Sequence, residues 1–300
     1  MKFIKPSVEI ITEPDLFKRI EIGARNCYQS FDKCGPGSDI DIFKKLVARG
    51  HESALEHSNI VVVCDSVASV DMKVAINTYR NSVGKPNVFR QSVDPELGLL
   101  CYVWSGNLRA WRDLCRYNTD SALLYSLFHN YPGFEDIELT SGHANGKAAF
   151  CNKYESDRHS IITARFICDR GVSHELVRHR CLSFSQESTR YCRYEDGLMF
   201  IEPWWWPQEQ ETSDTALVRM ACQAAEDAYC SMINSGCSPQ KARCVLPNML
   251  KTEVVATGTV EQWKTLVLPL RLSKAAHPDI RRLMELFCQQ LGWDPDEFRK

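Results

Sequence analysis

Residues 161–191 read IITARFICDRGVSHELVRHRCLSFSQESTRY and hold the clearest structural pattern of the chain. The first seven residues are mostly β-branched or apolar, which favours a strand. The residues from about Val172 to Cys181 then follow the spacing of a helix. We therefore predict a strand that leads into a helix, followed by the most polar segment of the chain.

Arginine is concentrated in and just after this stretch, at Arg170, Arg178, Arg180, Arg190 and Arg193. Because the whole chain is slightly acidic, this local concentration favours a bound anion: guanidinium groups match the geometry of phosphate and carboxylate. Ser188 and Thr189 precede Arg190 and add donors that suit a phosphate monoester. The alternative is a solvated helix face whose arginines pair with Glu175 and Glu187.

Helices and strands alternate in other parts of the chain as well. Helices are predicted near residues 14–30, 38–50, 66–79, 107–114 and 217–236, strands near 60–63, 99–104 and 253–257, and a loop over 82–100. Two short patterns recur: Val63-Cys64-Asp65 precedes Ser69 by the spacing at which Ile167-Cys168-Asp169 precedes Ser173, and residues 105–111 (SGNLRAW) parallel residues 257–263 (TGTVEQW). A partial internal duplication and a chance match are both open at this point.

Composition excludes several classes of protein. The chain has 300 residues, enough for two domains or one large one, and a formal net charge of −2 from 36 Lys and Arg against 38 Asp and Glu. This charge disfavours a general coat for DNA or RNA. The 14 cysteines include no C-x-x-C pair, the N-terminus lacks the apolar region of a signal peptide, and no apolar run approaches the roughly 20 residues of a membrane helix. We therefore expect a cytoplasmic protein with reduced thiols that binds neither a membrane nor a nucleic-acid polymer.

The histidine spacing predicts no metal site. His174 and His179 are five residues apart, which on a helix separates them by roughly 140°, so they cannot share one ion. His51 and His57 lie in a polar segment that offers no Cys or Asp as a third ligand. The run Trp204-Trp205-Trp206 is interpreted as internal packing or a subunit contact.

Four ordered motifs resemble those of one family, the flavin-dependent thymidylate synthases (ThyX). Arg178-His179-Arg180 followed after seven residues by Ser188 resembles the family signature, and residues 166–177 resemble the strand and helix before it. The other matches are residues 51–57 (HESALEH), residues 242–247 (ARCVLP), and Leu270-Arg271 followed by Ala276-His277-Pro278. The resemblance implies an α/β (α+β) fold with a mixed or antiparallel sheet and surrounding helices. It also implies a homotetramer and a single domain over residues 1–300, with an inserted α/β segment at about 60–159.

The resemblance implies a reaction and a set of site residues. The reaction is the reductive methylation of dUMP to dTMP, with methylenetetrahydrofolate as carbon donor and NADPH-reduced FAD as hydride source. By matched position, the FAD-binding residues are His51, Ser53, Arg178, His179, Arg180 and Gln186. The dUMP-binding residues are Glu175, Arg178, Gln186, Ser188, Thr189, Arg190 and Arg243. Arg271 matches the catalytic arginine that polarises the uracil, and its alternative role is a surface ion pair with Asp279 or Glu285.

The chain departs from the family pattern at two places. Thr259 and Glu261 stand where the family often has the Asn and Arg of an N-x-R element that contacts FAD, and Arg271 lies one residue later than usual. Asn107 and Arg109 have the N-x-R spacing in the parallel segment, so we hypothesise that they supply the lost FAD contacts. The alternative is that Arg109 is a solvated helix residue.

Two other functions stay open on sequence grounds. One is a catalytically inactive relative of ThyX that binds nucleotide as a regulatory module. The other is a sequence-specific RNA binder that uses the arginine-rich segment, although the net charge and the lack of a basic aromatic platform count against it.

Overall fold

The computed structural model describes residues 1–83, 88–97, 101–152, 154–207 and 211–299. The chain divides into two compact units. The first unit comprises residues 1–12, 22–35 and 162–300, and the second comprises residues 13–21 and 36–161. The second unit is therefore larger than the insertion indicated by the sequence, and the single-domain assignment stays a prediction.

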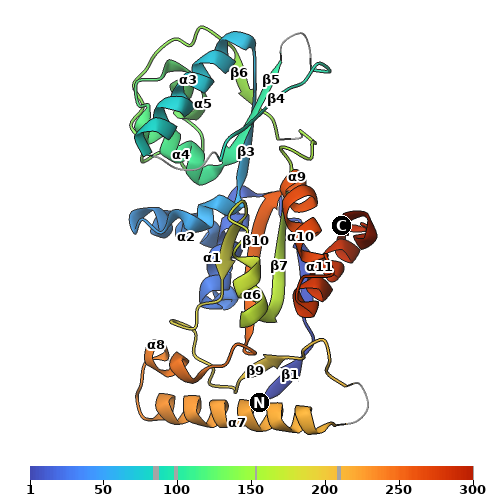
Figure 1. Ribbon diagram of the computed structural model, residues 1–300. Coiled ribbons are helices and arrows are strands. Elements are labelled where there is room, and N and C mark those ends of the chain that lie inside the picture. The colour runs from blue at the N-terminus through green and yellow to red at the C-terminus, as the bar shows by residue number, and fades with distance from the viewer. Residues whose placement is uncertain (84–87, 98–100, 153, 208–210, 300) are drawn as a thin grey trace. The chain divides into compact units, whose positions relative to one another are not determined.

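The first unit is built on a four-stranded sheet in the order β2-β7-β10-β8 (Figure 1). Its strands are β2 (Ser7–Ile11), β7 (Ile161–Asp169), β8 (Ser183–Gln186) and β10 (Lys251–Thr259). β2 runs antiparallel to β7, and β8 runs antiparallel to β10. The helices of this unit include α6 (Arg170–Leu176), α10 (Leu268–Arg271) and α11 (Pro278–Leu291). This is the expected combination of an antiparallel sheet with surrounding helices.

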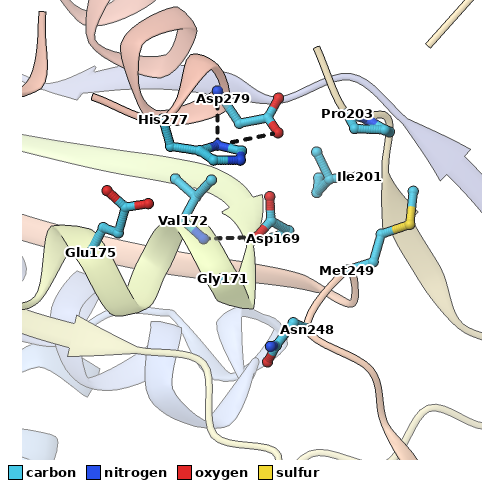
Figure 2. Close-up of a pocket in the computed structure, with 10 residues that line it drawn as sticks. All are labelled: Asp169, Gly171, Val172, Glu175, Ile201, Pro203, Asn248, Met249, His277 and Asp279. Atoms are coloured by element: carbon cyan, nitrogen blue, oxygen red, sulfur yellow. Dashed lines mark hydrogen bonds and ion pairs between the residues drawn. The ribbon is translucent and has the colours of Figure 1, made fainter. Parts of the chain in front are cut away.

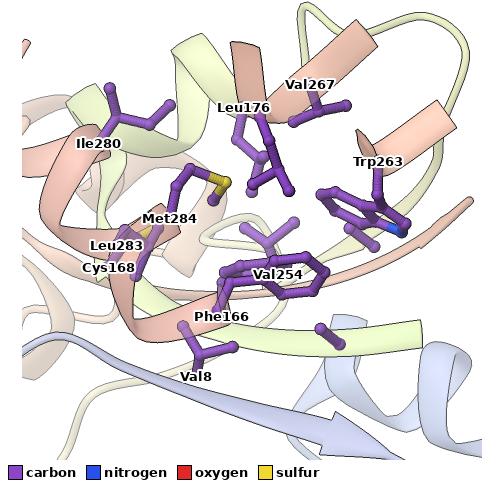
Figure 3. Close-up of a cluster of buried hydrophobic side chains, with 14 of the residues drawn as sticks. Val8, Phe166, Cys168, Leu176, Val254, Trp263, Val267, Ile280, Leu283 and Met284 are labelled. Atoms are coloured by element: carbon purple, nitrogen blue, oxygen red, sulfur yellow. The ribbon is translucent and has the colours of Figure 1, made fainter. Parts of the chain in front are cut away.

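An apolar cluster between this sheet and its helices forms the core of the first unit (Figure 3). Phe166 of β7, Trp263 and Phe287 of α11 are fully buried, with the rings of Trp263 and Phe287 4.5 Å apart. Each buried side chain of this size contributes roughly 1.5–3 kcal/mol to folding. The core therefore fixes β7, and with it the start of α6.

A second, smaller layer of the first unit contains α7 (Ser213–Asn234) and α8 (Pro239–Ala242). Two short parallel strands, β1 (Lys2–Ile4) and β9 (Met199–Ile201), complete it. Within the tryptophan run, Trp206 stacks on Phe3 at 4.8 Å, so at least this tryptophan is used for packing within the unit.

The second unit holds another four-stranded sheet, in the order β4-β5-β3-β6 (Figure 1). Its strands are β3 (Asn59–Cys64), β4 (Arg90–Val93), β5 (Tyr102–Asn107) and β6 (Ala148–Phe150). Its helices are α2 (Ser38–Ala48), a 3₁₀ helix (Glu52–His57), α3 (Ser66–Val83), α4 (Leu108–Tyr117) and α5 (Ala122–Phe128). Helix α1 (Leu16–Tyr28) has its first residues in the second unit and its last residues in the first.

Two local predictions are corrected. The helix expected to reach Cys181 ends at Leu176, because the chain turns back within six residues to enter β8. The segment expected to be a loop over residues 82–100 contains β4, which pairs with β5. Residues 99 and 100 of the strand expected over 99–104 lie outside the described residues, and β5 begins at Tyr102. None of the helices in the described part of the chain has the length and apolarity that crossing a bilayer requires.

Candidate active site

The strand β7 leads directly into α6 and so places the start of the site. Asp169 ends the strand and caps the helix, because its Oδ1 accepts the backbone N–H of Val172 at 2.7 Å. The helix ends at Leu176, so Arg178, His179 and Arg180 follow it in a tight turn closed by the Leu182 N–H and the His179 carbonyl. The side chains of Arg178 and Arg180 are exposed, whereas His179 is buried.

Three predicted site residues from separate parts of the sequence meet in one cluster. Arg271 of α10 donates from Nε to His179 Nε2 at 2.7 Å. It also donates from Nη1 to Glu175 Oε2 and from Nη2 to the Glu175 carbonyl, both at 2.7 Å. The side chain of Arg271 is 19% exposed, so its charge is only partly solvated and depends on these partners.

His179 is neutral in this cluster. Burial and the neighbouring Arg271 charge lower its pKa to about 4. Because Nε2 accepts a hydrogen bond from the Nε–H of Arg271, the neutral ring carries its own proton on Nδ1. The ring can therefore donate one hydrogen bond from Nδ1 without bringing a second positive charge beside Arg271.

A π-helical turn over Trp263–Val267 lies directly before α10. The indole of Trp263 donates to the carbonyl of Ile162 at 3.2 Å and fixes the start of this turn to β7. The turn thus connects the start of β7 to the helix that carries Arg271.

Gln186 lies at the end of β8, where it is held by two hydroxyl groups. Its Nε2 donates to Ser173 Oγ at 2.9 Å and to Thr252 Oγ1 at 3.1 Å. Both amide hydrogens are used in this way, so the carbonyl oxygen of the side chain is the group that a ligand can use. An acceptor in a fixed position suits the N–H of a pyrimidine ring.

The loop after β8 presents hydroxyl groups and arginine together. Ser188 Oγ accepts the backbone N–H of Arg190 at 3.3 Å, and Thr189 is 7% exposed. Arg190 is exposed, and its Nε donates to Gln240 of α8 at 2.9 Å. This bond ties the loop to α8, whose next residue after its end is the exposed Arg243. Two exposed guanidinium groups and a hydroxyl on adjoining segments suit a phosphate group.

A buried charge cluster includes Glu187 of this loop, and sequence reasoning missed it. Lys251 Nζ lies 3.1 Å from Glu187 Oε2 and 2.5 Å from Glu253 Oε1. Tyr194 donates its hydroxyl to Glu187 Oε1 at 2.9 Å. Burial lowers the pKa of Lys251, but attraction to Glu187 and Glu253 outweighs this, so the pKa is raised and the ammonium group stays charged. Glu187 stands between Gln186 and Ser188, so the cluster anchors the loop that carries both.

A pocket of about 370 Å³ opens beside α6 (Figure 2). Its lining includes Glu175 together with Asp169, His277 and Asp279, which the sequence analysis did not assign to a site. His277 Nδ1 accepts the N–H of Asp279 at 3.3 Å. Burial raises the pKa of Asp169 and of Asp279, and the charge of Asp279 raises that of Asp169 further. The signal that could have found Asp169 is its place between a buried strand and a helix.

One segment of the chain is similar to a known protein family. Residues 156–293 match the sequence model of a family described as thymidylate synthase complementing protein. The matched segment contains all of the predicted site residues of the first unit, from Glu175 to Arg271.

Similar proteins carry the name flavin-dependent thymidylate synthase. One from Mycobacteroides abscessus is 33% identical over 138 residues, which is 41% of this chain and 54% of the relative. One from Geobacter sulfurreducens is 33% identical over 132 residues, which is 43% of this chain and 56% of the relative. The chain thus spans about half the length of the curated relatives it matches. The crystal structure of the UMP/dUMP methylase PolB from Streptomyces cacaoi, bound with 5-Br UMP, aligns with 97% of this chain and 91% of its own at 14% identity and a TM-score of 0.43.

The remaining residues that the family resemblance assigns to FAD lie in the second unit. His51 and Ser53 are exposed at the start of the 3₁₀ helix, and the Glu52 between them is buried and pairs with Arg116 at 2.7 Å. Asn107 is committed to capping α4, because its Oδ1 accepts the N–H of Ala110 at 2.8 Å. These FAD assignments stay predictions.

Arg109, the last of these candidates, is engaged within the second unit. It pairs with Glu56 at 2.6 Å and lies 4.0 Å from Asp113. Its assignment to FAD also stays a prediction. No group of three or more His, Cys, Asp or Glu suited to a metal ion occurs in the part of the chain that the structure describes.

Proposed function

We propose that this protein methylates dUMP to dTMP as a flavin-dependent thymidylate synthase. In this proposal methylenetetrahydrofolate supplies the carbon and NADPH reduces FAD. The observation that carries it is the cluster of Arg271, His179 and Glu175, because the family motifs predicted all three residues and Arg271 donates to each of the other two at 2.7 Å.

The first unit offers a matching surface for dUMP. The dianionic phosphate would be bound by Arg190 and Arg243, with Ser188 and Thr189 supplying hydrogen bonds. The carbonyl oxygen of Gln186 would accept the N3–H of uracil.

Arg271 acts on the pyrimidine ring in this arrangement. It donates toward the uracil carbonyl and stabilises the negative charge that develops on the ring when C5 becomes nucleophilic. Glu175 and His179 hold the guanidinium in place for this role.

Residues after α6 fit a flavin dinucleotide. The exposed guanidinium groups of Arg178 and Arg180 suit a diphosphate, and the Nδ1–H of His179 is a neutral donor to a flavin ring edge. FAD, when bound, supplies the hydride that completes the methyl group. The task of these residues is to bind the dinucleotide and favour its anionic reduced form.

The thiols near the site are unsuited to attack uracil. Burial raises the pKa of Cys168 far above its ordinary value and raises that of Cys192 to about 11. Both thiols are therefore protonated at neutral pH and poor nucleophiles. This supports a mechanism in which neither Cys168 nor Cys192 forms a covalent bond to the substrate.

The test combines a spectrum with an activity assay. The purified protein, supplied with FAD, should show the visible absorption of bound flavin and should form dTMP from dUMP, methylenetetrahydrofolate and NADPH. Arg271→Lys should keep the flavin spectrum and lose roughly 10²-fold or more in turnover, because lysine cannot reproduce the three-bond fork. The control Arg219→Lys, an exposed residue of α7, should leave turnover unchanged.

The outcomes separate the proposal from its rival. A protein that binds dUMP but no flavin, and forms no dTMP, would be the inactive nucleotide-binding relative. A protein in which Arg271→Lys retains full turnover would contradict the role given to Arg271.

A further inference from the structure

The two units contain sheets of the same design. The strand orders are β8-β10-β7-β2 in the first unit and β4-β5-β3-β6 in the second. In the second unit the chain runs β3, α3, β4, β5, α4. The first unit has the same order in β7, α6, β8, β10, α9 (Val260–Gln262), with β9, α7 and α8 added between β8 and β10. The fourth strand differs in its place in the sequence. β2 comes before the other strands of its sheet, whereas β6 comes after the other strands of its sheet.

The pairing of β8 with β10 and the pairing of β4 with β5 have the same register. Ser183 pairs with Thr257 in the first unit as Arg90 pairs with Ser105 in the second. The agreement continues past the ends of the strands. The N–H of Glu187 donates to the Glu253 carbonyl at 2.8 Å, and the N–H of Asp94, at the equivalent position, donates to the Cys101 carbonyl at 3.0 Å. A slip of one residue would abolish this match, because it turns every side chain to the other face.

The capping residues occur at equivalent positions. Asp169 accepts the N–H of Val172 at 2.7 Å, and Asp65 accepts the N–H of Ala68 at 2.9 Å. The serine four residues after each aspartate also accepts a glutamine amide, Ser173 from Gln186 and Ser69 from Gln91, but Gln91 stands by the register at the position of Phe184 and not of Gln186.

A tryptophan and a glycine recur as a pair. Trp263 donates its indole N–H to the Ile162 carbonyl and Trp111 donates to the Ile60 carbonyl, both at 3.2 Å. A Cβ on Gly258 would lie 3.5 Å from the Trp263 indole nitrogen, and one on Gly106 would lie 3.4 Å from that of Trp111. The closest contacts are with apolar side chains, because a Cβ on Gly258 would lie 2.2 Å from Leu182 Cδ2 and one on Gly106 would lie 2.8 Å from Phe89 Cδ1. In both units glycine therefore leaves space for an apolar side chain beside the indole.

We infer that the second unit contains a second copy of the fold of the first and that this copy has lost the nucleotide site. By the register, Val93, Pro95 and Leu97 stand at the positions of Gln186, Ser188 and Arg190. None of the three has a polar side chain, so the phosphate donors and the uracil acceptor are missing.

The helix that follows the first strand has changed in the same way. Counting from the capping aspartates, Val74 of α3 stands at the position of Arg178, and it is 60% exposed. Helix α3 also continues through the positions of Arg178, His179 and Arg180 without the turn that carries them in the first unit. The second copy therefore keeps the scaffold and lacks the anion-binding side chains.

The identity of the lost ligand rests on the proposed function, whereas the duplication itself does not. One chain should then bind one dUMP. Arg109 occupies the position of Glu261 and is engaged with Glu56, so its role lies within the second unit.

Two measurements on the full-length protein test this. In a deuterated sample, amide NOEs should connect the strands in the registers given above, including contacts from Asp94 to the Cys101 strand and from Glu187 to the Glu253 strand. A register in the second unit that differs by one residue would overturn the duplication.

Calorimetric titration with dUMP should give one site per chain. Arg190→Ala should abolish that site, and the matched change in the other copy, Leu97→Ala, should leave it unchanged. Two sites per chain, or a site that survives Arg190→Ala but is lost in Leu97→Ala, would overturn the loss of the second site. If the wild type binds no dUMP, the proposed function fails, and the strand register still decides the duplication.

Discussion

Removing the buried ammonium group of Lys251 should destabilise the protein strongly. The side chain of Glu187 is 1% exposed and that of Glu253 is 12% exposed, and Lys251 lies between them at 3.1 and 2.5 Å. In Lys251→Met both carboxylates stay in place, since Tyr194 and the Glu253 N–H still hold Glu187. The thioether cannot compensate their charge, so the native state contains two neighbouring buried anions.

The expected loss is set by the cost of breaking a buried ion pair. Such a change lowers the free energy of unfolding by about 3–5 kcal/mol. Part of this cost is relieved when a carboxyl group takes up a proton, so the loss should be smaller at pH 5.5 than at pH 8. Adding Glu187→Gln to the variant removes one anion and should recover part of the lost stability.

Urea unfolding of the wild type, of Lys251→Met and of Lys251→Met with Glu187→Gln, each at pH 5.5 and pH 8, gives the free energies of unfolding. Lys274→Met, a change at an exposed position, is the control and should stay within about 0.5 kcal/mol of wild type. Because Glu187 anchors the loop of Gln186 and Ser188, the affinity for dUMP should also fall in Lys251→Met under conditions where it is folded. A loss below about 1 kcal/mol that is equal at both pH values would refute the reasoning.

Three further outcomes follow from the site and the core. Arg190→Ala should weaken dUMP binding at least tenfold and FAD binding little, as measured by separate titrations, whereas Arg193→Ala should change neither. Cys192→Ala should still form dTMP, and an inactive variant that is folded and loaded with flavin would count against the thiol-independent mechanism. Burial, with a smaller contribution from Arg19, lowers the pKa of His57 to about 4. The unfolded chain therefore binds a proton on His57 near pH 6.5 that the native state does not bind, so this residue should contribute a fall of about 2 kcal/mol in the free energy of unfolding from pH 7 to pH 5. His57→Gln should remove that contribution from the slope measured by urea unfolding, and an equal slope in the variant would show that other groups cause it.

The sequence predicted those elements whose signals are local. The strand at Ile161–Asp169 and the helix that begins after Asn107 depend on residue type within a few positions, and both lie where expected. β1 and β9 were missed because each has three residues and is defined by its pairing partner. The end of α6 was missed because it is set by the return of the chain into β8.

The site was predictable where a family motif covered it. Glu175, His179 and Arg271 came from three motifs, and residue chemistry alone would have left Arg271 as a surface ion pair. The partner of Arg271 is Glu175 rather than Asp279 or Glu285.

The partner of Glu187 was harder to predict. The sequence analysis considered this residue as a surface partner of arginine, and only the pairing of β8 with β10 shows that it meets Lys251. Lysine and glutamate are rarely buried, so composition gave no reason to expect the pair inside.

A comparison of the two copies separates the residues that build the fold from those that bind. Asp169, Gly258 and Trp263 have counterparts in the second unit with the same hydrogen bond or close contact, so these residues are sufficient for the strand–helix scaffold without a ligand. Gln186 and Arg190 have no such counterparts. Because the second sheet keeps its register without them, the scaffold does not require them, and their presence in the first unit must be explained by what that unit binds. The turn at Arg178 has no counterpart either: the second copy continues as a helix at the equivalent position, whereas α6 ends at Leu176.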